Sequence, residues 1–283
     1  MTTRFSSSPP RQNRPKGPYR ALASVLISLM GLGYLLSQPR WMFSLATRLW
    51  PGAHYAANLP TSEADSNRSD NHSDDRSKIV ALSIDDGPSP ATKSILTTLN
   101  RHNAKATFFN ISGNLPDYED TVRQSLAAGH EFGNHLTADE PSIRLSAEAF
   151  EADLLTAEEA ISSLLPNNDP AESSDLAWLR PGMGFYNPQM VRTARSHGYQ
   201  LVLGSVFPYD THVPSSRFAT AFILRTIQPG DIIVLHDGET RGARTAATLE
   251  RVLPVLQARG YQVTTISELF EKLPDSNMAP NTP

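Results

Sequence analysis

Short apolar runs and longer stretches with helical spacing alternate along most of this chain. Between residues 78 and 272 the apolar runs predict seven strands, at 79–84, 106–111, 131–134, 178–179, 200–206, 231–235 and 262–266. The stretches between them predict six helices, at 91–102, 117–128, 146–165, 188–197, 215–227 and 245–259. This alternation predicts an α/β domain with a parallel sheet, either open or closed into a barrel one strand short of the eight-stranded kind.

The first 50 residues follow another pattern. Residues 1–20 form a polar, basic tail, and the next 17 residues, Ala21–Ser37, carry no charge. That run is at the short end for a membrane-spanning helix, and a cluster of basic residues precedes it. We therefore expect residues 21–50 to be an uncleaved transmembrane or signal-anchor region, in preference to a cleaved signal peptide or a buried soluble helix. With the basic end inside, the rest of the chain would be anchored outside the cytoplasm; secretion is the alternative.

Two further segments are predicted to be flexible. Residues 51–77 are expected to be a disordered linker, because residues 61–77 are rich in Ser, Asp and Asn and hold no large apolar residue. Residues 273–283 are expected to be a flexible tail. The folded domain is therefore predicted to span residues 78–272.

Charge and cysteine content narrow the chemistry. The first 62 residues hold seven basic and no acidic side chains, whereas the rest of the chain holds 18 basic and 29 acidic ones. An acidic domain of this kind lacks the basic footprint of a nucleic-acid-binding protein, which also disfavours a phosphodiesterase. Because the chain has no cysteine, a metal ion would have to be bound by His, Asp or Glu.

Polar clusters follow five of the predicted strands or the loops after them, at residues 85–88, 134–139, 180–184, 209–210 and 235–237. The carboxyl ends of parallel strands share one edge of a sheet, so we expect these clusters to form one site. They supply carboxylates, two histidines and an arginine. Such a set is typical of a metal-assisted hydrolase with a separate general base and general acid.

The second cluster suggests metal ligands. His135 and Asp139 are four residues apart, a spacing that puts both on one face of a helical turn. With Asp86 they would give two carboxylates and one imidazole, which suit Zn²⁺, Mn²⁺, Co²⁺ or Fe²⁺.

The remaining clusters offer groups for orientation and proton transfer. Arg180 can hold a carboxylate in a bidentate pair, and backbone N–H groups of residues 181–184 can face a developing oxyanion. His236 is the candidate general acid, and Asp210 could hold its imidazole and favour the protonated form. As a single residue, Asp210 is equally compatible with a loop cap.

The segments Asp-Asp-Gly-Pro, Gly-His-Glu-Phe-Gly-Asn-His, Arg-Pro-Gly-Met-Gly and Leu-His-Asp, in this order, resemble the motifs of the polysaccharide deacetylases. These are the NodB-homology domains of carbohydrate esterase family four, and the resemblance covers residues 78–270. It implies a distorted seven-stranded β/α barrel and the removal of acetyl groups from N-acetylated sugars in chitin or peptidoglycan.

The resemblance also implies roles for single residues: Asp85 as general base, Arg180 as the residue that orients it, Met183 as the source of an oxyanion-binding N–H, His236 as general acid, Asp210 as its partner, and Asp86 and His135 as metal ligands. The sequence departs from the family pattern at two places. Asp139 stands where the motif His-x-x-x-His has its second histidine, which favours Co²⁺ or Mn²⁺ beside Zn²⁺. Thr211 follows Asp210 where an aromatic residue is usual.

We therefore expect a metal-dependent hydrolase that removes N-acetyl groups from an N-acetylglucosamine-containing polysaccharide, peptidoglycan or a chitin-like oligosaccharide. One divalent ion would be bound by Asp86, His135 and Asp139. The expected partners are an N-acetylated glycan and the membrane, with no nucleic acid, and the pattern indicates no oligomeric state. Two alternatives stay open: an O-acetyl esterase on an acetylated polysaccharide, and a non-catalytic glycan-binding module with a degenerate metal site.

Overall fold

The computed structural model of the chain describes residues 33, 36–57, 78–165, 177–238 and 240–273. The chain divides into two compact units, Met1–Ser37 and Gln38–Pro283, and almost all of the described residues belong to the second. The predicted membrane run Ala21–Ser37 lies almost entirely outside the described residues. Within the described ranges, no helix has the length and apolar character needed to cross a membrane.

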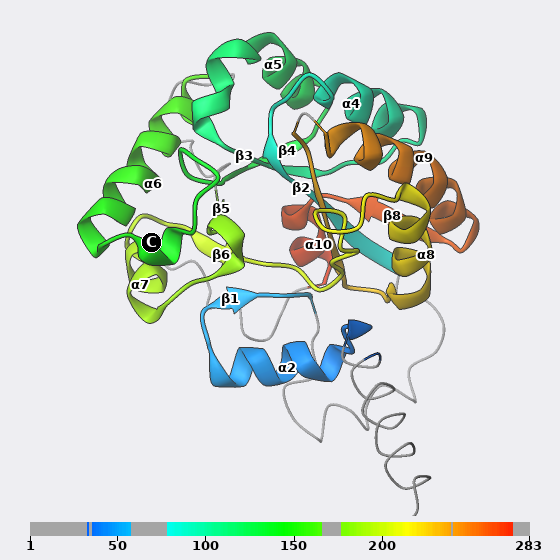
Figure 1. The fold of residues 1–283 in the computed structure, drawn as a ribbon, viewed down its shortest axis with the longest axis horizontal. Helices are drawn as coiled ribbons and strands as arrows, with labels where there is room; N and C mark the ends of the chain where they lie inside the picture. The colour runs from blue at the N-terminus through cyan, green and yellow to red at the C-terminus, as the bar shows by residue number, and fades with distance from the viewer. Residues whose placement is uncertain (1–32, 34–35, 58–77, 166–176, 239, 274–283) are drawn as a thin grey trace, which may run out of the picture. The chain divides into compact units, whose positions relative to one another are not determined.

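The second unit is built on one sheet of parallel strands, most of which lie near the centre of Figure 1. The strands run in the spatial order β1-β6-β5-β4-β3-β2-β7, and β8 pairs with β2 on the edge that also carries β3. Their bounds are β1 Ala53–His54, β2 Lys78–Gly87, β3 Thr107–Asn110, β4 Glu131–Asn134, β5 Trp178–Leu179, β6 Gln200–Val202, β7 Ile232–His236 and β8 Tyr261–Thr264. Each of the seven predicted strands has a counterpart here, and β1 is an additional short one.

The sheet closes on itself through a single bridge. The chain that leaves β6 reaches β7, where Val206 and Ile233 form an isolated parallel bridge. Strand β2 pairs with β7 along one edge, and along the other edge its first half pairs with β8 and its second half with β3. The result is a distorted ring of strands, with β1 and β8 outside the closed circuit.

Helices surround this ring (Figure 1). Their bounds are α4 Thr92–Arg101, α5 Glu119–Ala127, α6 Ala147–Ser162, α7 Pro188–Ser196, α8 Ser216–Thr226 and α9 Gly242–Ala258, close to the predicted ranges, followed by α10 Ile266–Lys272. Side-chain caps fix several beginnings. The side chains of Ser146, Asn187 and Ser215 each accept a hydrogen bond from a backbone N–H in the first turn of the helix that follows.

The alternation of side chains along β2 divides the core into two parts. Val80, Leu82 and Ile84 point into the larger apolar cluster, which the outer helices complete. Ile79 and Ala81 point into a second cluster on the other face of the strand, against α10. Because successive strand residues point to opposite faces, each polar residue later on β2 points to the face that its position in this alternation gives it.

The folded unit begins earlier than predicted. Helix α2 (Arg40–Leu49) lies in the range expected to be a membrane region, yet its Phe43 is buried against Tyr55 and Phe207 at ring-centroid distances of 5.6 and 6.4 Å. Arg40 donates a hydrogen bond to the carbonyl of Ala57 at 3.2 Å. A ten-residue amphipathic helix with charged ends is suited to pack on a protein surface, and too short to span a bilayer.

Strand β1 also corrects the predicted linker. Residues 51–57 were expected to be disordered, but Ala53 and His54 pair in parallel with Leu201 and Val202 of β6. Ala53 and His54 do not form an apolar run, so the sequence pattern does not indicate this strand. The rest of the predicted linker, residues 58–77, lies outside the described residues.

Candidate active site

The candidate site residues lie at the carboxyl ends of β2, β4, β5 and β7 and in the loops that follow these strands and β6. On β2, Ser83 and Asp85 continue the face that carries Ile79 and Ala81. On the neighbouring strand β7, His236 is the register partner of Asp85. Strand pairing and alternation therefore place the predicted base and the predicted acid side by side before any side-chain contact is considered.

Asp85 is held by the buried guanidinium of Arg180. The Nη1 of Arg180 lies 2.6 Å from Asp85 Oδ1 and 2.6 Å from Ser83 Oγ, and its Nε donates to the carbonyl of Val202 at 3.0 Å. The guanidinium also lies over the ring of Phe109, 4.1 Å from its centroid. These contacts leave Arg180 little freedom, so the carboxylate of Asp85 is held in a fixed orientation.

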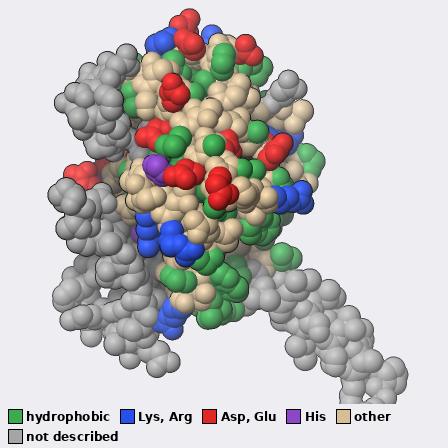
Figure 2. All heavy atoms as spheres, turned by 90° about the vertical axis from the view of Figure 1, so that its left-hand side faces the viewer, with side chains coloured by type: hydrophobic (Ala, Val, Ile, Leu, Met, Phe, Trp, Pro, Cys, Tyr) green, Lys and Arg blue, Asp and Glu red, His purple; other side chains and the backbone are tan. Residues whose placement is uncertain are grey.

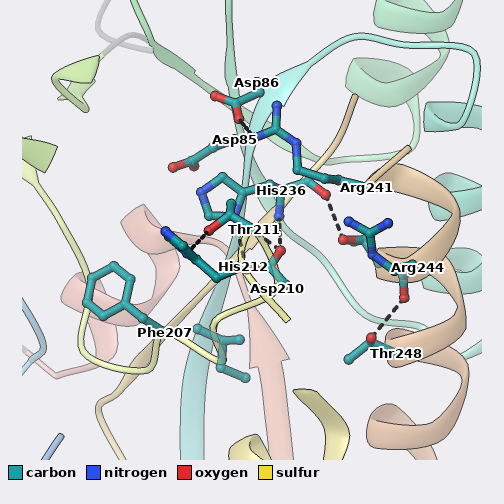
Figure 3. A network of polar contacts seen from close by, with 12 residues as sticks. Asp85, Asp86, Phe207, Asp210, Thr211, His212, His236, Arg241, Arg244 and Thr248 are labelled. Carbon is teal, nitrogen blue, oxygen red and sulfur yellow. Dashed lines mark hydrogen bonds and ion pairs between the residues drawn. The ribbon is translucent and has the colours of Figure 1, made fainter. Parts of the chain in front are cut away.

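His236 is held by Asp210 (Figure 3). Its Nδ1 lies 3.1 Å from both carboxylate oxygens of Asp210, and its backbone N–H donates to Asp210 Oδ2 at 2.9 Å. Burial by itself lowers the pKa of His236. The hydrogen bond and charge of Asp210, with the charges of Asp85 and Asp86, outweigh burial and raise that pKa above its usual value. The imidazole is therefore disposed to carry a proton near neutral pH.

Asp86 and His135 face each other. His135 Nδ1 lies 2.7 Å from the carbonyl oxygen of Arg180, which can only accept, so Nδ1 carries the hydrogen. The other ring nitrogen, Nε2, lies 3.2 Å from Asp86 Oδ1. A neutral ring would point a lone pair at a carboxylate there, so a cation is needed between the two atoms, whether a proton on Nε2 or a metal ion.

The charges of this pair are strongly coupled. Burial raises the pKa of Asp86, but the hydrogen bond and charge of His135, with the charges of His236 and Arg241, lower it overall. Burial lowers the pKa of His135, but the hydrogen bond of Asp86 and the charges of Asp85 and Asp86 raise it overall. Both shifts favour an ionised carboxylate beside a positive charge.

Asp139 does not join this pair, contrary to the predicted set of three ligands. Its side chain is 52% exposed, and its charged contact is with Arg241 Nη2 at 3.9 Å. The prediction assumed a helical turn after His135, but Leu136 takes a left-handed φ of 65° and the backbone N–H of Thr137 donates to Asp153 Oδ1 at 3.2 Å. The four-residue spacing therefore does not bring Asp139 onto the face of His135.

Arg241, which the sequence analysis did not identify, contacts Asp86 directly. Its Nη1 lies 3.1 Å from Asp86 Oδ2, and Figure 3 shows its guanidinium beside the two adjacent carboxylates of β2. No strand pattern or motif spacing marks Arg241, because it belongs to the irregular turn before α9. Its place between Gly238 and Gly242, soon after His236, is the one signal that pointed to a turn near the site.

Asp237 has a structural role that the sequence did not predict. It is fully buried, accepts a hydrogen bond from Ser89 Oγ at 2.6 Å and another from Thr92 Oγ1, and accepts one from the backbone N–H of Gly238 at 2.8 Å. These bonds join the end of β7 to the turn after β2. They fix the carboxyl ends of β2 and β7, which carry Asp85 and His236, relative to each other.

Met183 lies in a short 3₁₀ segment, Gly182–Gly184, after β5. Its φ is 58° and its side chain is 66% exposed, so only its backbone can serve the chemistry predicted for it. Gly182 fixes this segment, because a Cβ there would come within 2.0 Å of the carbonyl oxygen of Glu140. The role of the Met183 N–H stays a prediction.

The donor set fits a divalent ion in part. Asp86 and His135 offer an oxygen and a nitrogen 3.2 Å apart, with the tautomer of the histidine set by a backbone carbonyl, as is usual for a metal-binding imidazole. Across the described residues, however, no three His, Asp or Glu side chains converge as a metal-binding group. Two of the three predicted ligands are thus in place and the third is not.

Comparison with known proteins gives a consistent family. The model of the polysaccharide deacetylase family matches residues 72–202. A peptidoglycan-N-acetylglucosamine deacetylase of Bacillus cereus is 33% identical over 196 residues, which cover 68% of this chain and 88% of that protein. A chitooligosaccharide deacetylase of Bradyrhizobium sp. is 30% identical over 202 residues, with 67% and 90% covered.

Solved structures give the same result for the fold. The peptidoglycan deacetylase PdaC from Bacillus subtilis superposes with a TM-score of 0.62 at 26% sequence identity, covering 71% of this chain and 93% of that one. The α/β sheet, the order of the motifs along the chain and these similarities agree. The chain therefore belongs to the polysaccharide deacetylase family of enzymes, the NodB-homology domains of carbohydrate esterase family four.

Proposed function

We propose that this enzyme removes N-acetyl groups from an N-acetylglucosamine-containing glycan, with peptidoglycan or a chitin-like oligosaccharide as the substrate class. The observation that carries the proposal is the pair of supported acid–base groups on neighbouring strands. Arg180 pairs with Asp85 at 2.6 Å, and Asp210 lies 3.1 Å from His236 Nδ1 and raises the pKa of that imidazole. In amide hydrolysis a carboxylate can accept a proton from the attacking water, and a protonated imidazole can donate one to the leaving nitrogen. The two groups lie opposite each other on neighbouring strands here.

The proposed reaction uses these two groups in sequence. Asp85 accepts a proton from a water molecule as that water attacks the acetyl carbon. Backbone N–H groups near Met183 stabilise the charge that develops on the acetyl oxygen. His236 then donates its proton to the sugar nitrogen as the carbon–nitrogen bond breaks, which releases acetate and a free amine.

Asp86 and His135 are the residues that would bind a divalent ion, next to the position of the attacked carbonyl. Such an ion supplies Lewis-acid polarisation of the acetyl oxygen and makes a nearby water more acidic. The choice between Zn²⁺, Co²⁺ and Mn²⁺ is part of the proposal. With one nitrogen and one oxygen ligand in place, the donor set suits all three.

Acetate release from defined substrates tests the proposal. Purified protein is assayed with N-acetylglucosamine oligomers and with acetylated xylan, with each ion added in turn to metal-stripped enzyme. We expect acetate from the N-acetylated oligomers. Release from xylan alone would identify an O-acetyl esterase. Glycan binding with no release under any ion would identify a non-catalytic module, an outcome made relevant by the outward position of Asp139.

We also propose that the protein is held at a membrane surface, outside the cytoplasm, by the uncharged run Ala21–Ser37. Helix α2 begins three residues after this run, and the side of α2 that faces away from the domain exposes Trp41, Leu45, Leu49 and Trp50. In Figure 2, hydrophobic and basic side chains gather in the lower part, at the height that α2 has in Figure 1. Tryptophan with arginine is the composition that favours the lipid–water interface.

A further inference from the structure

We propose that Arg241 is a built-in counter-cation of the metal site, which has to leave Asp86 before a divalent ion can bind. The inference rests on the proposed metal-assisted function and concerns a residue to which neither the family resemblance nor the mechanism above gives a part. It follows from where the guanidinium lies.

The guanidinium spans the two carboxylates that the sequence predicted to surround a metal ion. One nitrogen, Nη1, lies 3.1 Å from Asp86 Oδ2, and the other, Nη2, lies 3.9 Å from Asp139 Oδ2. Together with His135 on Oδ1, Arg241 gives both oxygens of Asp86 a positively polarised partner. A divalent ion that took Asp86 as a ligand would meet this positive charge at short range. In the low-dielectric surroundings of a buried carboxylate, such repulsion is strong.

The backbone on both sides of Arg241 packs closely against neighbouring residues and brings Arg241 near Asp86. Gly242 permits the close approach of α9 to the turn after β2, because a Cβ there would lie 2.3 Å from Asp237 Oδ1 and 2.5 Å from Ala91 Cβ. At Gly238, with φ at 104°, a Cβ would lie 3.3 Å from Arg241 Nη2. Backbone packing around buried Asp237 therefore fixes the point from which the side chain of Arg241 extends.

The side chain is nevertheless free to leave. Arg241 is 28% exposed, so the guanidinium borders solvent while Asp86 is buried. Asp139, 52% exposed, would remain a partner for the arginine after it leaves Asp86. Movement of one long side chain would thus exchange a monovalent organic cation for a divalent ion, and the apo site would keep its carboxylate neutralised.

Metal affinity of the full chain tests the proposal. Isothermal titration with Zn²⁺ and with Co²⁺ compares metal-stripped wild type with Arg241→Gln, Arg241→Lys and Arg251→Gln. Arg251 lies on α9, the helix that follows Arg241, is exposed, and donates to the carbonyl of Ala247 of that helix, so its variant removes the same charge away from the site. Asp86→Asn shows whether the measured ion binds at this site.

We expect Arg241→Gln to bind the ion about tenfold more tightly than wild type, a change typical of groups next to metal ligands. Arg241→Lys should stay closer to wild type, Arg251→Gln should equal wild type, and Asp86→Asn should not bind. The proposal would be overturned if Arg241→Gln bound the metal ion as tightly as wild type or more weakly. It would also be overturned if Arg251→Gln gained the same affinity, or if no variant bound the ion. Thermal unfolding of each variant confirms that the fold is retained.

Acetate release measured on the same samples separates this inference from the proposed function. If the affinities follow the expected order and no sample releases acetate, the inference stands and the proposed function fails. If acetate is released and Arg241→Gln leaves the affinity unchanged, the function stands and the inference fails. An increase in KM for glycan with unchanged metal affinity would assign Arg241 to substrate contact, and so also overturn it.

Discussion

At the scale of single residues, the site consists of charged pairs whose members come from different strands and from the loops that follow them. Asp85 pairs with Arg180, His236 with Asp210, and Asp86 with both His135 and Arg241. The proton acceptor and the proton donor of the proposed reaction are therefore each held by a partner of their own, and the partner of His236 also raises its pKa.

The pair of His236 and Asp210 makes a prediction for pH dependence. A general acid works in its protonated form, so activity is lost as pH rises through the pKa of His236, which Asp210 holds above the usual value. Asp210→Asn removes the charge that raises that pKa. We expect the alkaline limb of kcat/KM for acetate release to move to lower pH. The exposed Asp120→Asn serves as control, and an alkaline limb that stays in place in Asp210→Asn would contradict the assignment.

Residues that directly follow a strand could be placed from the sequence, whereas Asp139 and Arg241, in irregular segments, could not. Asp85, Arg180 and His236 follow recognisable apolar strands, so strand pairing brings them together as expected. Asp139 and Arg241 lie in irregular segments, where one left-handed residue such as Leu136 redirects the chain. Sequence spacing carries distance information only inside regular structure, which is why the third ligand was misplaced.

At the scale of elements, the strands from β2 onward and the helices between them were predictable because apolar runs alternate with stretches of helical spacing. Helix α2 lies in the range predicted to be a membrane region, and strand β1 lies in the range predicted to be a disordered linker. The amphipathic α2 directly follows an uncharged run, and β1 has two residues. Their place in the fold depends on contacts with residues far along the chain, such as Gln38 with Phe207 and Arg40 with Asp231, which local patterns do not encode.

The packing of α2 predicts an asymmetric response to alanine. Phe43→Ala should lower the free energy of unfolding of the full chain by about 2–3 kcal/mol, because it removes a ring buried against Tyr55 and Phe207. Leu45→Ala, on the exposed side of the same helix, should change it by less than about 0.5 kcal/mol. Urea titration measures both. Equal effects would mean that α2 is not part of the folded unit.

At the scale of the whole molecule, the proposed membrane attachment predicts where tryptophan meets lipid. The chain has three tryptophans: Trp41 and Trp50, which are exposed, and Trp178, which is buried in the core. In vesicles that contain brominated lipid, the fluorescence of the wild-type chain should be partly quenched. The double variant Trp41→Phe and Trp50→Phe, which retains Trp178, should show no quenching. Unquenched wild-type emission would contradict the interfacial position of α2.

The account depends most on Asp85 as the proton acceptor of a deacetylation reaction. The direct measurement is the rate of acetate release from N-acetylglucosamine oligomers by Asp85→Asn, beside wild type and the exposed Asp120→Asn, at saturating metal ion. Loss of a positioned general base should reduce kcat by at least about 100-fold in Asp85→Asn, with the fold intact and Asp120→Asn unchanged. A rate for Asp85→Asn within a few-fold of wild type would contradict the account.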